Sequence, residues 1–210
     1  MDLLIGIDAG TSVIKAVAFD LKGKQIAVTA KPNHYETLPN GGVEQELERT
    51  WTDTIEVIQQ LIKKVEDHQI IGIAVTGQGS GTWLIDKAGD PVGRGWLWLD
   101  ARAAELVESY EESTAARRRF ELTGTGLAAC DQAPQLLWMK KYQPEILSKS
   151  STAFHCKDWL YLNLTGKRTT DPSESVFSCG DFRKRNFSDE VIELLDLTEQ
   201  RALFPQVVDG

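Results

Sequence analysis

The chain has 210 residues, of which 41% are hydrophobic and 26% charged, a composition typical of a soluble globular protein with a sizeable core. Its 23 lysines and arginines stand against 31 aspartates and glutamates, which gives a formal net charge of −8. Contact with nucleic-acid phosphates needs a concentrated basic face, so this balance argues against a nucleic-acid partner.

The chain opens with three predicted β-strands joined by tight turns. Residues 3–7 are nearly all apolar, as in a central strand that is covered on both faces. Residues 13–19 are rich in β-branched side chains, and residues 26–30 continue this pattern. Gly10 and Gly23 supply the turns between these strands. The opening segment therefore predicts an antiparallel three-strand meander at the start of a mixed sheet.

The spacing of the apolar residues then changes to steps of three and four. Large apolar residues at positions 47, 51, 55, 58, 62 and 65 predict an amphipathic helix. A short apolar run over residues 70–77 predicts a buried strand after it. Strands followed by a helix and a further strand form a mixed α/β pattern.

The second half of the chain predicts short strands followed by helices. Strand ends are expected within residues 81–93 and 95–100, and helices over residues 102–120, 132–142 and 157–164. The segment after Thr165 is more polar and irregular, which predicts a loosely packed tail. No internal repeat or linker divides the sequence, so residues 1–210 are expected to form one domain.

The sequence lacks the usual signals of a membrane or secreted protein. No apolar run approaches the ~20 residues of a membrane span, and the start "MDLLIGID" has no basic region or small-residue cleavage site. Cys130, Cys156 and Cys179 are odd in number and widely spaced, which argues against a disulfide framework. A cytoplasmic protein without a membrane partner is expected. The arginine run at positions 117–119 is expected to be a solvated helix face.

The first candidate site is "DAGTS", which begins with Asp8 at the end of the first predicted strand. Backbone N–H groups in such a turn can converge on an anion, and the hydroxyls of Thr11 and Ser12 add donors. Lys15 can reach a phosphate, while Asp8 can hold Mg²⁺, usually through water because that ion gives up its water ligands reluctantly. The alternative is that Asp8 caps a tight hairpin and Lys15 points to solvent.

The second candidate site is "TGQGSG" at residues 76–81. Its glycines resemble a dinucleotide-binding loop, but that loop must open a helix, and here the strand-like "WLID" follows. A better interpretation is that the glycines keep the backbone low at a strand end, while Gln78 and Ser80 offer hydrogen bonds to a polar ligand. The alternative is a glycine-rich connection without a ligand.

The third candidate site is "WLWLDARAAE", which contains Trp98 and Asp100 at another strand-to-helix junction. An aromatic face beside a carboxylate suits a hydroxyl-rich small molecule, because C–H faces stack on rings and hydroxyls donate to carboxylates. The alternative for Asp100 is a simple helix N-cap. The same two interpretations apply to Asp131, which precedes a predicted helix.

In this order, the segments resemble the amino-terminal domain of the FGGY family of carbohydrate kinases, which includes glycerol kinase and xylulokinase. The segment "GIDAGTSVIKAVAFD" resembles the family's first phosphate motif, and "GGVEQELERTW" resembles its Glu-Gln-rich helix start. The segments "AVTGQGSG" and "LWLDARA" resemble its two substrate-lining turns, and "APQLLWMKKYQPEIL" and "KDWLYLNLTGKRTTDPSES" continue the match. The resemblance covers residues 4–208 in six ordered segments.

This resemblance implies an actin-like, ribonuclease H-like α/β domain that forms half of an ATP-dependent kinase. Carried over by position, Asp8 would face Mg²⁺ and the γ-phosphate of ATP. The residues that would contact phosphate are Gly10, Thr11, Ser12 and Lys15. The residues that would line the substrate are Gln78, Gly79, Ser80, Trp98, Asp100, Asp131 and Gln132.

The sequence departs from the best-known members of the family at Gly79 and Ser80. Glycerol kinase has an Arg-Glu pair there and xylulokinase has Met-His, so glycerol and xylulose are not the expected substrates. The three turns look most like the erythritol kinase branch, and the expected phosphate acceptor is a primary hydroxyl of a small polyol such as erythritol. Family members often form dimers, although no apolar stripe of this sequence identifies an interface.

The resemblance also implies that parts of the active site lie outside this chain. The base for the attacking hydroxyl and the adenosine site are expected in a second, carboxy-terminal ATP-binding domain. No catalytic base is therefore expected here, and residues 1–210 alone are expected to be inactive. Two other classes stay open, a non-catalytic sugar-binding module and an actin-like nucleotide-dependent scaffold.

Overall fold

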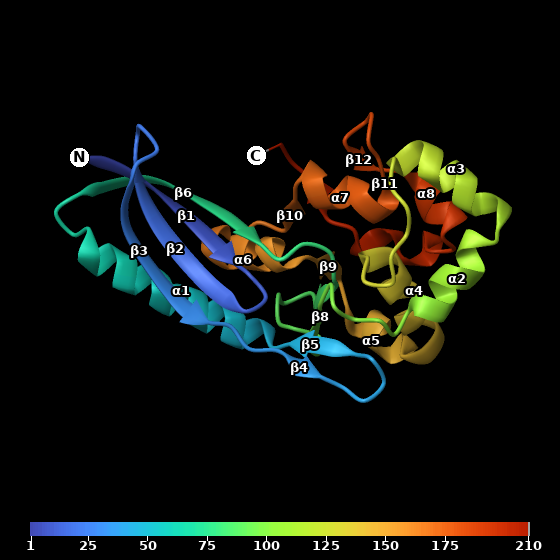
Figure 1. Cartoon of the computed structure of the whole chain (residues 1–210). Helices are drawn as coiled ribbons and strands as arrows, with labels where there is room; N and C mark the ends of the chain where they lie inside the picture. The colour runs from blue at the N-terminus through green and yellow to red at the C-terminus, as the bar shows by residue number, and fades with distance from the viewer. Residues whose placement is uncertain (210) are drawn as a thin grey trace.

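The computed structural model describes residues 1–209, apart from the side chain of Ser178. Figure 1 shows a sheet half, in which β1, β2, β3 and β6 lie beside α1, and a helical half that contains α2 to α5, α7 and α8. The strands are β1 (Asp2–Ala9), β2 (Val13–Asp20), β3 (Gln25–Pro32), β4 (Glu36–Thr37), β5 (Val43–Gln45), β6 (Gln69–Gly77), β7 (Trp83–Ile85), β8 (Gly95–Trp96), β9 (Thr152–Phe154), β10 (Thr169–Thr170), β11 (Gly180–Asp181), β12 (Asn186–Phe187) and β13 (Gln206–Val207). The helices are α1 (Leu47–Lys64), α2 (Ala104–Glu111), α3 (Thr114–Thr123), α4 (Gln132–Tyr142), α5 (Pro144–Lys149), α6 (Cys156–Thr165), α7 (Pro172–Cys179), α8 (Asp189–Leu194) and the 3-10 helix η1 (Thr198–Leu203).

The main sheet has the strand order β3-β2-β1-β6. The first three strands form the expected antiparallel meander, and β6 pairs with β1 in parallel. Ala9 lies opposite Gly77 in this parallel pair, so both strands end at the same edge of the sheet. The turn after β1 and the turn after β6 therefore start side by side, although 67 residues separate Thr11 from Gln78 in the sequence.

Helices cover one face of the sheet, and the expectation that residues 3–7 are covered on both faces is wrong, because Leu4 is 43% exposed. Leu3, Ile5 and Ile7 alternate along β1 and are buried, since side chains at every second position point to the same face. They belong to a core cluster that includes Val57 of α1 and Leu160 of α6. This packing fixes the face of the sheet on which each later residue of β1 lies, and Asp8 falls on the opposite face.

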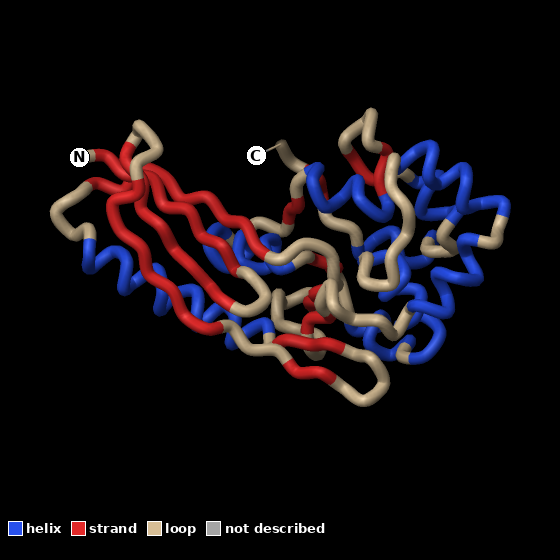
Figure 2. Tube along the Cα trace, viewed as in Figure 1, coloured by secondary structure: helices blue, strands red, loops and turns tan. Residues whose placement is uncertain are grey.

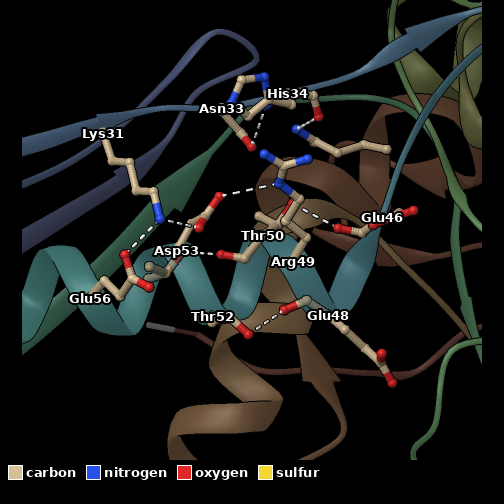
Figure 3. Close-up of polar contacts among 12 residues, drawn as sticks. Lys31, Asn33, His34, Glu46, Glu48, Arg49, Thr50, Thr52, Asp53 and Glu56 are labelled. Atoms are coloured by element: carbon tan, nitrogen blue, oxygen red, sulfur yellow. Dashed lines mark hydrogen bonds and ion pairs between the residues drawn. The ribbon is translucent and has the colours of Figure 1, made fainter.

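Charged contacts fasten β3 to α1. Figure 3 shows Lys31 between two carboxylates of α1, with Nζ 2.5 Å from Asp53 Oδ1 and 2.6 Å from Glu56 Oε2. These hydrogen bonds, first that to Asp53, raise the pKa of Lys31. The chain leaves β3 directly at Asn33, so this contact also positions the residue that lies behind the turn after β1 (Figure 3).

The helical half has its own core, and it corrects three expectations. The segment after Thr165 is not a loose tail, because Val191 and Leu197 are fully buried in this second cluster. The expected helix over residues 102–120 is two helices, interrupted at Ser113, whose backbone is extended. Arg119 of the arginine run is buried, and its Nη1 donates to Thr125 O, so only the two arginines before it form a solvated face.

The strand predicted over residues 70–77 is present as β6, but it is not buried as expected, since Ile71 and Ile73 are each 49% exposed. The outer edge of β6 is open among residues 1–209, where β6 pairs only with β1. A groove of about 550 Å³ runs along this edge, and its lining includes Ile73, Val75, Tyr161 and Leu164. The residues of the turn after β1 do not line this groove. In the part of the chain that the structure describes, no helix is long and apolar enough to cross a membrane.

Candidate substrate and phosphate site

The candidate residues gather where β1 and β6 end. Figure 2 shows the loops that follow these strands between the sheet and the helical half. Polar ligands of open α/β sheets commonly bind at the carboxyl ends of parallel strands, because the connecting loops there leave backbone groups unpaired. Loops around residues 98–102 and 128–132 approach the same place through contacts with these turns.

Asp8 and Lys15 form a charge pair at this edge. They lie directly opposite each other in the β1–β2 pairing, and Lys15 Nζ is 3.7 Å from Asp8 Oδ2. Both side chains are about half exposed, with 46% of Asp8 and 50% of Lys15 accessible. Gly10 N donates to Val13 O and closes the turn. Asp8 thus faces solvent beside a cation and does not cap the hairpin.

Asn33 holds the turn after β1 from behind. Its Nδ2 donates to Gly10 O at 2.9 Å, and its backbone N donates to Ser12 O at 2.8 Å. The amide of Gly10 is used inside the turn by Val13 O, so it is not available to an anion. Ser12 remains exposed and is the hydroxyl that this turn presents outward.

A chain of hydrogen bonds joins the three candidate turns through Thr11. Trp98 Nε1 donates to Thr11 Oγ1 at 2.8 Å, and Thr11 Oγ1 donates to Gln78 Oε1 at 3.1 Å. Gln78 Nε2 then donates to Gln45 Oε1 at 2.7 Å, and Gln45 Nε2 donates to His34 O at 2.9 Å. The hydroxyl hydrogen of Thr11 and the amide of Gln78 are therefore engaged within the protein, and their role visible in the structure is to fix the turns together.

Asp100 is enclosed by donors. Its Oδ2 accepts from Val43 N at 2.9 Å and from Arg102 Nη2 at 2.6 Å, and its Oδ1 accepts from Arg102 N at 3.0 Å. Arg102 Nη2 also lies 2.8 Å from Glu44 Oε1. The side chain of Asp100 is fully buried, so it organises the loop that carries Trp98 and does not itself reach the surface. It is not the helix N-cap either, since that position of α2 is Ala103.

Aromatic rings complete the support of this loop. The guanidinium carbon of Arg102 lies 3.2 Å from the ring centroid of Trp96 and 5.6 Å from that of Trp138, a cation–π arrangement. The two rings meet edge to face at 5.2 Å between centroids. Trp98, in contrast, is 47% exposed, so a large part of this residue is accessible to a ligand.

Ser80 and Asp131 join the turn after β6 to the start of α4. Ser80 has a φ of +53°, and its Oγ donates to Asp131 Oδ1 at 3.2 Å. Asp131 Oδ2 accepts from Ala128 N at 2.9 Å, and burial raises the pKa of this carboxyl. The neighbouring Gln132 is also buried and donates from Nε2 to Phe154 O. Asp131 and Gln132 lie behind the turn and shape it.

A buried ionic cluster lies beside Gly79. His155 Nδ1 is 3.4 Å from Asp158 Oδ2, and His155 Nε2 is 3.6 Å from Glu174 Oε2. Burial by itself lowers the pKa of His155, but the two carboxylates, Glu174 first, outweigh it and hold that pKa above its ordinary value. Lys157 Nζ contacts Asp158 Oδ1 at 2.7 Å, and the pKa of Asp158 is lowered by His155 and Lys157 despite its burial.

The structure brings all the sequence-predicted residues to one region but divides them by exposure. Those open to solvent at least in part are Asp8, Gly10, Thr11, Ser12, Lys15, Gly79, Ser80 and Trp98. Gln78, Asp100, Asp131 and Gln132 are buried. The sequence did not predict Gln45, Arg102, His155 or Glu174 as site residues. Gln45, Arg102 and Glu174 fall within segments quoted above for their resemblance, whereas no signal pointed to His155.

Asp8 suits a magnesium ion that takes most of its ligands from water and substrate phosphates. Among residues 1–209 no group of three or more His, Cys, Asp or Glu side chains could enclose a metal. Asp8 is half exposed, and nothing among those residues donates a hydrogen bond to its carboxylate, so both oxygens are available to water bound to the ion. Mg²⁺ commonly keeps several waters and is held through one or two carboxylates together with substrate phosphates.

Comparison with known proteins gives a consistent result over the whole chain. The family model described as "FGGY family of carbohydrate kinases, N-terminal domain" matches residues 3–210. An erythritol kinase from Brucella abortus (strain 2308) is 51% identical over 211 residues, which cover 100% of this chain and 41% of the relative. A probable L-xylulose kinase from Pasteurella multocida (strain Pm70) is 29% identical, over 99% of this chain and 44% of the relative.

Solved structures show the same fold. A ligand-bound xylulose kinase from Lactobacillus acidophilus superimposes with a TM-score of 0.91 at 21% identity, covering 100% of this chain and 42% of that one. A glycerol kinase from Plasmodium falciparum with ADP gives a TM-score of 0.88 at 21% identity, covering 99% of this chain and 43% of that one. The expected actin-like mixed α/β fold is confirmed. The chain spans about two fifths of the length of the relatives it matches.

Removal of the Asp100 carboxylate is expected to destabilise the fold. The change Asp100→Ala leaves Val43 N without its acceptor and the buried Arg102 with Glu44 as its remaining carboxylate partner, and loss of one partner of a buried ion pair costs up to about 3 to 5 kcal/mol. Urea unfolding followed by circular dichroism measures this loss. The exposed Asp67→Ala is the matched control and should change stability by less than about 0.5 kcal/mol. Equal stabilities of the two variants would contradict the role assigned to Asp100.

The raised pKa of His155 predicts a stability that falls on the alkaline side. The protonated ring is stabilised by its carboxylates, so its contribution is complete below the unfolded pKa of about 6.5 and is lost as the pH rises through the folded pKa. The free energy of unfolding should fall as the pH is raised from 6.5 towards 9, and it should fall less in His155→Gln. Urea titrations at a series of pH values test this, and superimposable profiles of the two proteins would refute it.

Proposed function

The chain belongs to the FGGY family of carbohydrate kinases as its N-terminal domain, and from this premise we propose that it forms the polyol-binding wall of an ATP-dependent kinase. The proposed reaction transfers the γ-phosphate of ATP to a primary hydroxyl of a small polyol. The name of the relative with 51% identity supports erythritol as the polyol. Use of ATP agrees with a cytoplasmic protein.

One observation carries this proposal, the hydrogen bond from Trp98 Nε1 to Thr11 Oγ1. It holds an exposed aromatic face next to a turn whose charged and hydroxyl groups suit phosphate. A kinase needs its acceptor hydroxyl and the transferred phosphate in one place, because phosphoryl transfer depends mainly on positioning and charge neutralisation. An actin-like scaffold would need the turn but not the exposed ring.

On the phosphate side, we assign contacts to the exposed groups of the turn. Lys15 would neutralise phosphate charge, and Ser12 would donate a hydrogen bond. Asp8 would hold Mg²⁺ through water, and the ion, when bound, would neutralise charge on the β- and γ-phosphates. Thr11 and Gly10 would contribute the shape of the turn, since their polar groups are engaged within the protein.

On the substrate side, we assign stacking to Trp98 and polar contacts to the turn after β6. The C–H face of a polyol would lie on the indole, as apolar faces of small ligands do on aromatic rings. Gly79 and Ser80 present backbone and hydroxyl groups beside it, while Gln78, Asp100, Asp131 and Gln132 hold these groups in position. The base that receives the proton of the attacking hydroxyl would come from outside this chain.

The kinase test uses the full-length protein that contains this chain, MgATP and a panel from glycerol to the pentitols, with xylulose. Phosphorylation of a small polyol, erythritol above the others, is the expected result. Release of ADP with none of these compounds, under conditions in which a known polyol kinase is active, would refute the proposed function and favour a binding module.

The change Asp8→Asn should abolish most turnover while substrate binding remains. Loss of the carboxylate weakens the charge stabilisation of the transferred phosphate, and removal of one such group typically lowers kcat by about 100-fold or more. The KM for the polyol should change by less than about threefold, since Asp8 does not touch the polyol in this proposal. Steady-state kinetics measures both, with Asp2→Asn at the far end of β1 as control. Wild-type turnover in Asp8→Asn would contradict the assignment.

A further inference from the structure

Glu174 is a mostly buried carboxylate next to the proposed substrate site. It lies in the first turn of α7, and only 14% of its side chain is exposed. A Cβ atom placed on Gly79 would lie 3.2 Å from Glu174 Oε1, so the carboxylate reaches the turn after β6 directly. Neither the sequence motifs nor the assignments above give this residue a contact with the substrate.

The hydrogen-bonding capacity of Glu174 is unfilled among residues 1–209. Its charged neighbour His155 has Nε2 at 3.6 Å from Oε2, which is beyond hydrogen-bond distance. The neighbouring Asp158 differs, because its oxygens accept from His155 N, Thr170 Oγ1 and Lys157 Nζ at 2.7 to 3.0 Å. Buried polar groups are nearly always hydrogen-bonded, so this largely buried carboxylate is free to accept a hydrogen bond from water or from a bound ligand.

The absence of a side chain at Gly79 leaves the carboxylate accessible from the substrate side. The backbone of Gly79 is exposed, and any side chain there would begin in contact with Oε1. His155 lies at the other oxygen of Glu174, with Nε2 3.6 Å from Oε2. The open direction of Glu174 is therefore the one that passes Gly79.

We propose that Glu174 is a specificity-determining residue whose carboxylate accepts a hydrogen bond from a hydroxyl of the bound polyol across Gly79. This inference rests on the proposed function, since that function supplies the polyol. A carboxylate only accepts hydrogen bonds, so it favours a hydroxyl at this position and offers nothing to a carbonyl oxygen. It also repels sugar acids. The site therefore selects polyols over the corresponding ketoses and acids.

The experiment compares erythritol with erythrulose, which carries a carbonyl in place of one hydroxyl, in the full-length kinase. Glu174→Gln should raise the KM for erythritol by about 10-fold or more, because a hydrogen bond to a charged group is lost. It should also reduce the preference for erythritol over erythrulose, since the amide can donate to a carbonyl. Glu193→Gln, at an exposed position of α8, is the matched control and should leave both values unchanged.

A second variant tests the same contact from the other side. Gly79→Ala places a methyl group against Glu174 Oε1 and should also raise the KM for erythritol. Gly126→Ala is its control and should leave the KM unchanged, because the added Cβ would have no atom within 4 Å. If Glu174→Gln fails to fold, as judged by circular dichroism, the preference for erythritol over erythrulose in Gly79→Ala decides the question, since a purely steric effect of the methyl group would raise the KM for both compounds.

Two results would overturn the inference, and they are distinguishable. Folded variants with unchanged KM and unchanged preference, in an enzyme that phosphorylates erythritol, would refute the role of Glu174 alone. A wild-type enzyme that phosphorylates no compound of the polyol panel would refute the proposed function together with this role.

Discussion

The parallel pairing of β1 with β6 is the constraint on which the site depends. It sets Ala9 opposite Gly77, so the turns that follow the two strands begin side by side at the same edge of the sheet. Burial of alternate residues of β1 fixes this register, because a shift by one position would expose Ile5 and Ile7 and bury Asp8. Packing of the hydrophobic core therefore places Asp8 on the solvent-exposed face, at the edge of the sheet where the other loops of the site lie.

Two sets of polar contacts hold these loops in a fixed arrangement. The hydroxyl of Thr11 accepts from Trp98 and donates to Gln78, so one small side chain joins three loops. Arg102 neutralises Asp100 and lies over Trp96, which fixes the loop that presents Trp98. Interior groups therefore use their hydrogen-bonding capacity within the protein. The groups left for ligands are an exposed ring, the charge pair after β1 and the carboxylate of Glu174.

Local sequence patterns predicted the elements of the sheet half and the region of the site, but not its internal contacts. The meander and the long helix α1 have strong periodicity, and α4 starts and ends where the pattern indicates. The break at Ser113 and the packed segment after Thr165 were missed, because burial of single apolar residues there depends on distant partners. The same reason applies to Gln45 and Glu174, since their neighbours in the site lie far away in the sequence and no local spacing predicts such a contact.

The most direct test of the central claim, that this surface is the polyol wall of a kinase, is a calorimetric titration of the 210-residue chain with erythritol. Saturable binding is expected, weakened at least about 10-fold in Trp98→Ala, because the stacking face and its link to Thr11 are both removed. Absence of binding, or equal binding by the wild type and Trp98→Ala, would contradict this claim.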